Sequence, residues 1–162
     1  MVAKKSKPVT RTKRPVAQAR ASTVAKRASA GRNAVAAEGV VDELRAFGLG
    51  YPGAHLKSPW PDHLDLAVKD KTFAYLSVSG EPLAISCKLP ESGLAALELP
   101  FATPTAYGLG KSGWVTARFA PGRKVPVNLL KEWIAESYRA VAPKKLWAKL
   151  AATSPAGSAA RP

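Results

Sequence analysis

Residues 64–88, LDLAVKDKTFAYLSVSGEPLAISCK, determine the fold class, because they contain three apolar runs separated by turn sequences. Every second residue from Leu64 to Val68 is apolar, which is typical of a strand buried on one face. Asp70-Lys71 and Ser79–Pro82 are short stretches of the kind found in turns. The sequence therefore predicts a three-stranded antiparallel meander, whose second and third strands cover Thr72–Val78 and Leu83–Lys88.

Helical patterns flank these strands on both sides. Apolar residues recur every three or four positions over residues 40–47 and over Val127–Val141, as on the buried face of a helix. Gly48 is placed to end the first helix, and Pro126 lies near the first turn of the second. The sequence also predicts a short helix, a second hairpin and a last helical segment over Pro90–Leu97, Thr105–Leu109 with Gly113–Phe119, and Lys144–Leu150. Strands grouped between helices indicate an α+β fold, an antiparallel sheet of about five strands with helices packed on one face.

The composition excludes several protein classes. Of the 162 residues, 46% are hydrophobic and 22% charged, which is enough apolar material for a folded core. No stretch approaches the roughly 20 uninterrupted apolar residues of a membrane-spanning helix. The single cysteine, Cys87, excludes a disulfide within the chain and a multi-cysteine zinc site.

The net charge of +14 is concentrated near the N-terminus. Residues 1–37 contain ten basic residues and no acidic one, whereas residues 38–150 contain 14 basic and 11 acidic residues. The ten cations are Lys4, Lys5, Lys7, Arg11, Lys13, Arg14, Arg20, Lys26, Arg27 and Arg32. Residues 1–33 have only small or short apolar side chains, so burial cannot offset the entropy of ordering them. We therefore predict a disordered basic arm over residues 1–33, an α+β domain over residues 34–150 and a flexible tail over residues 151–162.

The basic arm predicts a polyanionic partner. Lysine and arginine side chains neutralise phosphates and release counterions, which favours nucleic acid, and we expect DNA without base specificity from these contacts. The alternative is an extension that only aids solubility. The composition also fits a transit peptide. Because Leu, Ile and Phe are absent from residues 1–43, the apolar face of such a presequence would be weak. We expect a cytoplasmic protein that could associate with the nucleoid, with no membrane partner and with room for a protein partner.

Lys111, Trp114 and Arg118 form a second candidate contact for nucleic acid. If residues 114–119 are a strand, Trp114 and Arg118 share one face, and Val115, Ala117 and Phe119 share the other, which is the expected core face. Trp114 is then expected to be exposed. It could stack on an unpaired base. Alternatively, it could lie beneath Arg118 as a cation–π partner.

Other motifs do not suggest chemistry. Gly110-Lys111-Ser112 lacks the first glycine of a phosphate-binding loop, since position 105 is Thr105, and a strand pattern follows it in place of a helix. His55 and His63 could be drawn with nearby aspartates as a metal site, but surface histidines in a loop explain them better. Cys87 alternates with apolar residues and is expected in the core. We predict no catalytic residues, no cofactor and no metal, and hence no enzyme activity.

Several segments together resemble the MmcQ/YjbR family. They are Tyr51-Pro52-Gly53-Ala54, Lys69–Leu76, Leu83–Lys88, Tyr107–Val115 with its Lys-x-x-Trp pattern, and the helix from Leu130 to Val141. The resemblance covers about residues 36–150 and leaves out the basic arm. It implies a frataxin/CyaY-like fold, in which two helices pack on one side of an antiparallel sheet. Family members are described as DNA-binding proteins with a double-wing arrangement.

The resemblance to the frataxin fold also suggests iron binding as an alternative to DNA binding. In frataxins that function relies on an acidic ridge along the first helix and first strand. Here basic residues such as Arg45 and Lys69 are interspersed among the carboxylates, so no such ridge is expected. We therefore predict a non-enzymatic DNA-binding protein. The alternative is a protein-interaction or adaptor domain whose arm only aids docking or solubility.

Overall fold

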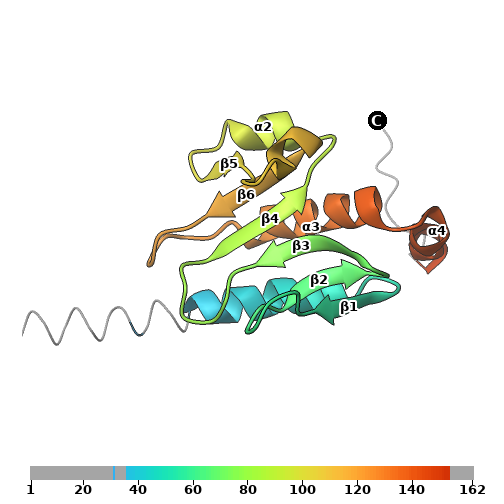
Figure 1. Ribbon diagram of the computed structural model, residues 1–162, viewed down its shortest axis with the longest axis horizontal. Coiled ribbons are helices and arrows are strands. Elements are labelled where there is room, and N and C mark those ends of the chain that lie inside the picture. The colour runs from blue at the N-terminus through green and yellow to red at the C-terminus, as the bar shows by residue number, and fades with distance from the viewer. Residues whose placement is uncertain (1–30, 32–35, 154–162) are drawn as a thin grey trace, which may run out of the picture.

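The computed structural model describes residue 31 and residues 36–153, and it has the predicted α+β architecture. A single antiparallel sheet contains six strands in the order β1-β2-β3-β4-β6-β5 (Figure 1). The strands are β1 (Ala54–Lys57), β2 (Asp65–Val68), β3 (Lys71–Leu76), β4 (Ala84–Lys88), β5 (Ala102–Pro104) and β6 (Trp114–Arg118). The predicted meander is thus confirmed as β2, β3 and β4.

Two long helices cover one face of this sheet. They are the first helix, described over residues 36–49, and α3 (Val127–Val141). Leu44 of the first helix and Ile134 of α3 are fully buried in one core with sheet residues such as Ile85 and Val115. Lys131 of α3 forms a 2.6 Å ion pair with Glu43, which links the two helices. The shorter helices are α2 (Gly93–Leu97), η1 (Leu109–Ser112) and α4 (Lys144–Thr153).

Two strand predictions were wrong. The edge strand β1 was not predicted, because its four residues, Ala54–Lys57, are too few to establish an alternation and lie between two turn sequences. The predicted strand Thr105–Leu109 is a loop. Its backbone enters the left-handed region at Tyr107 and Gly108, with φ of 57° and 78°, and such angles end an extended strand. The strand that pairs with β6 is instead β5, just before this loop.

A bulge in β3 sets which side chains face the helices. Leu66 lies opposite Ala74 but Ala67 lies opposite Thr72, so Phe73 is the extra residue. Ser137 of α3 stabilises the bulge, because its hydroxyl donates to the Phe73 carbonyl and accepts the Lys88 N–H at 2.8 Å. After the bulge, Ala74 and Leu76 are buried among the core residues, whereas Tyr75 lies on the face of the sheet opposite the helices.

The chain ends fall partly outside the described residues. α4 continues to Thr153, three residues into the predicted tail, and the segment Ala151-Ala152 suits a helix because alanine has a high helix propensity. The ten cations of the basic arm and the rest of the tail lie outside the described residues. The predicted disorder of the arm therefore stays a prediction.

Candidate nucleic-acid interface

The face of the sheet opposite the helices is lined by side chains of β3, β4 and β6. Cross-strand pairing places Tyr75 beside Ser86 and Ser86 beside Thr116. In the same register Ala84 lies opposite Arg118 and Lys88 lies opposite Trp114. We call this surface the open face.

Three hydroxyl groups form a connected row on the open face. Thr116 Oγ1 lies 2.7 Å from Ser86 Oγ and 2.9 Å from Thr105 Oγ1. A hollow of about 290 Å³ lies over part of this row, with Tyr75 and Arg118 in its lining. The hydroxyls form hydrogen bonds with one another. The lining of the hollow also includes the cationic side chain of Arg118.

Trp114 is not available for base stacking, and its predicted exposure was wrong. Only 7% of Trp114 is exposed, and its ring packs against Tyr75 with the centroids 5.3 Å apart and the planes tilted by 48°. Tyr75 and Trp114 belong to different strands, and Tyr75 itself is half-buried. Arg118 lies at the other end of β6, so the aromatic partner Tyr75 replaces the predicted cation–π contact with Arg118.

The structure does not bring Lys111 and Arg118 together. Lys111 belongs to η1, which precedes β6, and Arg118 is the last residue of β6. Arg118 is four positions after Trp114, which corresponds to about 13 Å along a strand. Both cations are exposed, but they lie at opposite ends of β6. A nucleic-acid contact by Lys111 stays a prediction.

Arg118 instead shares its end of the molecule with two cations that the sequence prediction missed. Arg123 and Lys124 are exposed in the segment between β6 and α3, PGRKVP over residues 121–126. The sequence feature that could have identified them is a pair of adjacent cations within a Pro/Gly-rich loop. In residues 36–153 the ion pairs are Arg45 with Asp42 and Lys131 with Glu43, so Arg118, Arg123 and Lys124 are unpaired there. We call these three residues the basic end.

The basic arm joins the domain at the basic end. Figure 1 shows the start of the first helix, the β3–β4 turn and the β6–α3 segment at the same end of the molecule. Ala36, the first residue of the continuous described chain, lines one cavity together with Arg123 and Lys124. Arg32 is four positions before Ala36, which corresponds to at most about 14 Å of chain. The arm and the basic end can therefore engage the same stretch of a polyanion.

The remaining candidate residues do not form a reactive site. Cys87 is fully buried, as predicted, and burial followed by the nearby charge of Glu136 raises the pKa of its thiol. His55 lies on β1, where its ring contacts the Gly53 carbonyl at 3.4 Å, and His63 lies in the β1–β2 loop. Across residues 36–153, no group of three or more His, Cys, Asp and Glu side chains is placed to hold a metal ion. Among the described helices, none has the length and apolar character that crossing a bilayer requires.

Comparisons with known proteins agree with the fold. The family model described as YjbR matches residues 49–140, more than half of the chain. A solved structure, that of Deinococcus radiodurans protein DR2400 with a DUF419 domain, is similar with 28% sequence identity and a TM-score of 0.56. That match covers 68% of this chain and 87% of the other. No curated protein matches the chain.

Proposed function

We propose that this chain, which belongs to the YjbR family, is a non-enzymatic DNA-binding protein that contacts phosphate backbones with its basic arm and basic end. Arginine and lysine bind phosphates in any sequence, so these contacts give affinity without base recognition. Binding of this kind needs no bond-making residue, cofactor or metal. Its place would be the cytoplasm, on or near the nucleoid.

One observation carries the proposal, namely that three exposed cations with no ion-pair partner within residues 36–153 lie near the point where the arm joins the domain. Arg123 and Lys124 line the same cavity as Ala36, and Arg118 ends the strand that leads into their loop. Ten further cations precede Ala36 in the sequence, and none of the first 37 residues is acidic. A surface of this kind attracts a polyanion from a distance as well as on contact.

The experiment that tests this proposal is a salt titration of DNA affinity. The full chain is compared with a variant in which all ten arm cations are replaced by glutamine, using a labelled 20-base-pair duplex. If the chain engages about six phosphates, the log–log plot of affinity against salt has a slope of ~−5. We expect the glutamine variant to bind much more weakly, with a slope nearer zero. Equal affinities and equal slopes for the two proteins would refute the proposal.

Protein binding is a second candidate function, favoured by apolar side chains at the other end of the molecule. Leu94 of α2 is 86% exposed, and Tyr107, in the loop before η1, is fully exposed. Exposed large apolar side chains are typical of interaction surfaces where they form one patch. If neither protein in the salt titration binds DNA, this second role is the one that remains.

A further inference from the structure

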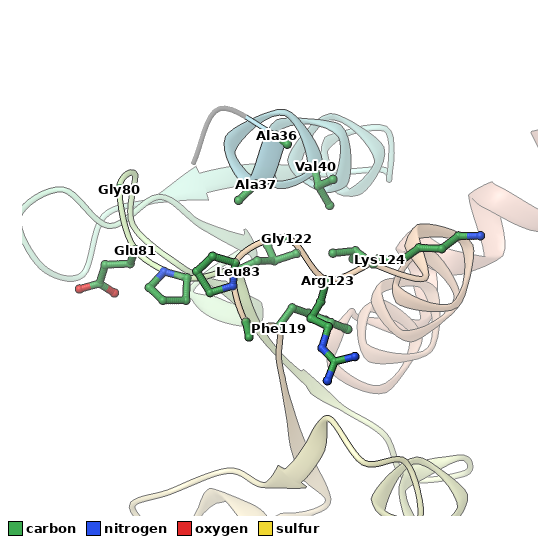
Figure 2. Close-up of a pocket in the computed structure, with 14 residues that line it drawn as sticks. Ala36, Ala37, Val40, Gly80, Glu81, Leu83, Phe119, Gly122, Arg123 and Lys124 are labelled. Atoms are coloured by element: carbon green, nitrogen blue, oxygen red, sulfur yellow. The ribbon is translucent and has the colours of Figure 1, made fainter. Parts of the chain in front are cut away.

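A cavity lies at the basic end, and the phosphate contacts proposed above do not use it. Its volume is about 560 Å³, within the range of roughly 300–1,000 Å³ that is usual for small-molecule sites. Three segments enclose it, as Figure 2 shows: the first helix, the β3–β4 turn and the β6–α3 segment. Its walls are largely apolar, with Ala37, Val40, Pro82, Leu83, Phe119 and Pro121 among them.

The charges at the rim of this cavity are asymmetric. Arg123 and Lys124 lie on one side of it, and Glu81 of the β3–β4 turn lies on the other (Figure 2). All three residues are exposed, and neither cation has an ion-pair partner within residues 36–153. An anionic group is therefore favoured on the Arg123 side and disfavoured on the Glu81 side.

The occupant must combine an apolar body with an anionic group. The basic arm itself fits poorly, because its ten cations would be brought against Arg123 and Lys124. A nucleotide has both features, since its base is flat and its phosphate is negative. The exposed prolines Pro82 and Pro121 offer flat apolar surfaces against which a base can pack, whereas Phe119 is only 6% exposed.

We propose that this cavity takes the base of one unpaired nucleotide, whose phosphate lies toward Arg123 and Lys124. The inference rests on the proposed function, because the arm and the basic end would hold the rest of the strand. Only an unpaired base can enter, since the faces of a base in a duplex are covered by its neighbours. The chain would therefore bind single strands or frayed ends more tightly than an intact duplex of the same length.

The test compares two alanine-to-phenylalanine variants of the full chain. Ala37→Phe fills the cavity, whereas the matched control Ala46→Phe changes an exposed position of the same helix. Fluorescence anisotropy is measured with a labelled 12-nucleotide single strand and with the corresponding duplex. We expect Ala37→Phe to weaken single-strand binding about fivefold or more, the loss of one base–protein stacking contact, while its duplex binding stays unchanged. Ala46→Phe should change neither affinity.

The outcomes separate this inference from the proposed function. Unchanged single-strand affinity in a folded Ala37→Phe variant would overturn the cavity assignment, while duplex binding by the wild-type chain would leave the phosphate contacts standing. No binding of either probe by the wild-type chain would refute both.

A second measurement keeps the inference testable if Ala37→Phe fails to fold. Amide resonances of Ala37 and Gly122 in the wild-type chain are followed by NMR during titration with adenosine monophosphate, adenosine or decanoate. We expect saturable shifts with the monophosphate at lower concentration than with adenosine, because only the former carries the anion. Saturable shifts with decanoate alone, or no shifts at all, would overturn the proposal.

Discussion

At the scale of single residues, burial decides which side chains can contact a ligand. The burial of Trp114 could not be predicted from the sequence. Strand alternation correctly placed Val115 and Ala117 in the core. It also placed Trp114 on the opposite face, but alternation says nothing about whether that face is covered. The ring that covers Trp114 is Tyr75, which is 39 positions earlier in the chain and becomes a neighbour only through the sheet.

Asp65 is a second residue whose environment could not be predicted from local pattern. It is fully buried at the start of β2, where one carboxylate oxygen accepts the Leu76 N–H at 3.0 Å. Its other oxygen, Oδ2, has no hydrogen-bond partner, although Arg45 is close enough to act on it electrostatically. Burial raises the pKa of this carboxyl, and the Leu76 hydrogen bond and the charges of His63 and Arg45 oppose that rise only in part.

This raised pKa predicts that the stability difference between the wild-type chain and an Asp65→Asn variant depends on pH. The folded state binds the Asp65 proton more tightly than the unfolded chain, so stability from this group is full below the unfolded pKa of about 3.9 and is lost as pH rises through the folded pKa. Asp65→Asn keeps an acceptor for Leu76 and removes the charge. We expect urea unfolding to show the variant gaining stability relative to wild type between pH 4 and pH 7. A difference that is constant or falls with pH would contradict this account.

At the scale of elements, side chains far apart in sequence hold the short pieces in place. The Glu136 carboxylate of α3 accepts the N–H groups of Glu91 and Ser92 at 2.8 and 3.1 Å, and the Ser92 hydroxyl at 2.6 Å. Burial alone would raise the pKa of Glu136, but these hydrogen bonds outweigh it and hold the pKa below its usual value. The anion thus fixes the segment that leads into α2.

Replacing Glu136 should loosen α2 with little effect on the rest of the fold. In Glu136→Gln all three donors lose a charged acceptor, and at least one of them faces an amide NH2 in place of an oxygen, which costs about 1–3 kcal/mol. We expect urea unfolding to show this loss at pH 7, and hydrogen exchange to show faster exchange of the α2 amides. Because the folded pKa of Glu136 is lowered, its stabilisation is present above the unfolded pKa of about 4.3 and is lost as pH falls through the folded value. A variant as stable as wild type at pH 7 would show that these contacts do not hold α2.

The elements themselves were largely predictable from periodicity. The meander and α3 follow from alternation and from apolar spacing, which are local properties of the chain. Edge strands such as β1 and β5 are too short to show a period, and only pairing with β2 and β6 defines them. The residues of the basic end share the same difficulty, since Arg123 and Lys124 lie in a loop whose position depends on the whole fold.

At the scale of the whole molecule, the account depends on where charge lies. The arm provides most of the positive charge. The topology places the β6–α3 segment, which follows Arg118 and contains Arg123 and Lys124, at the same end as the start of the first helix (Figure 1). The sequence alone predicted a cationic arm on a nearly balanced domain. The structure adds the position of Arg118, Arg123 and Lys124, which the register of β6 and the path of the β6–α3 segment determine. One end of the domain is therefore positively charged, like the arm.

The salt dependence of DNA binding by a basic-end variant tests this arrangement. Arg118→Gln, Arg123→Gln and Lys124→Gln are combined in the full chain with the arm intact. The control combines Lys71→Gln, Lys144→Gln and Lys145→Gln, exposed cations of the β2–β3 hairpin and α4. If the basic end binds phosphates alongside the arm, its variant should show a log–log slope smaller in magnitude by ~2–3, and the control should match wild type. A basic-end variant whose slope and affinity equal those of wild type would contradict the account.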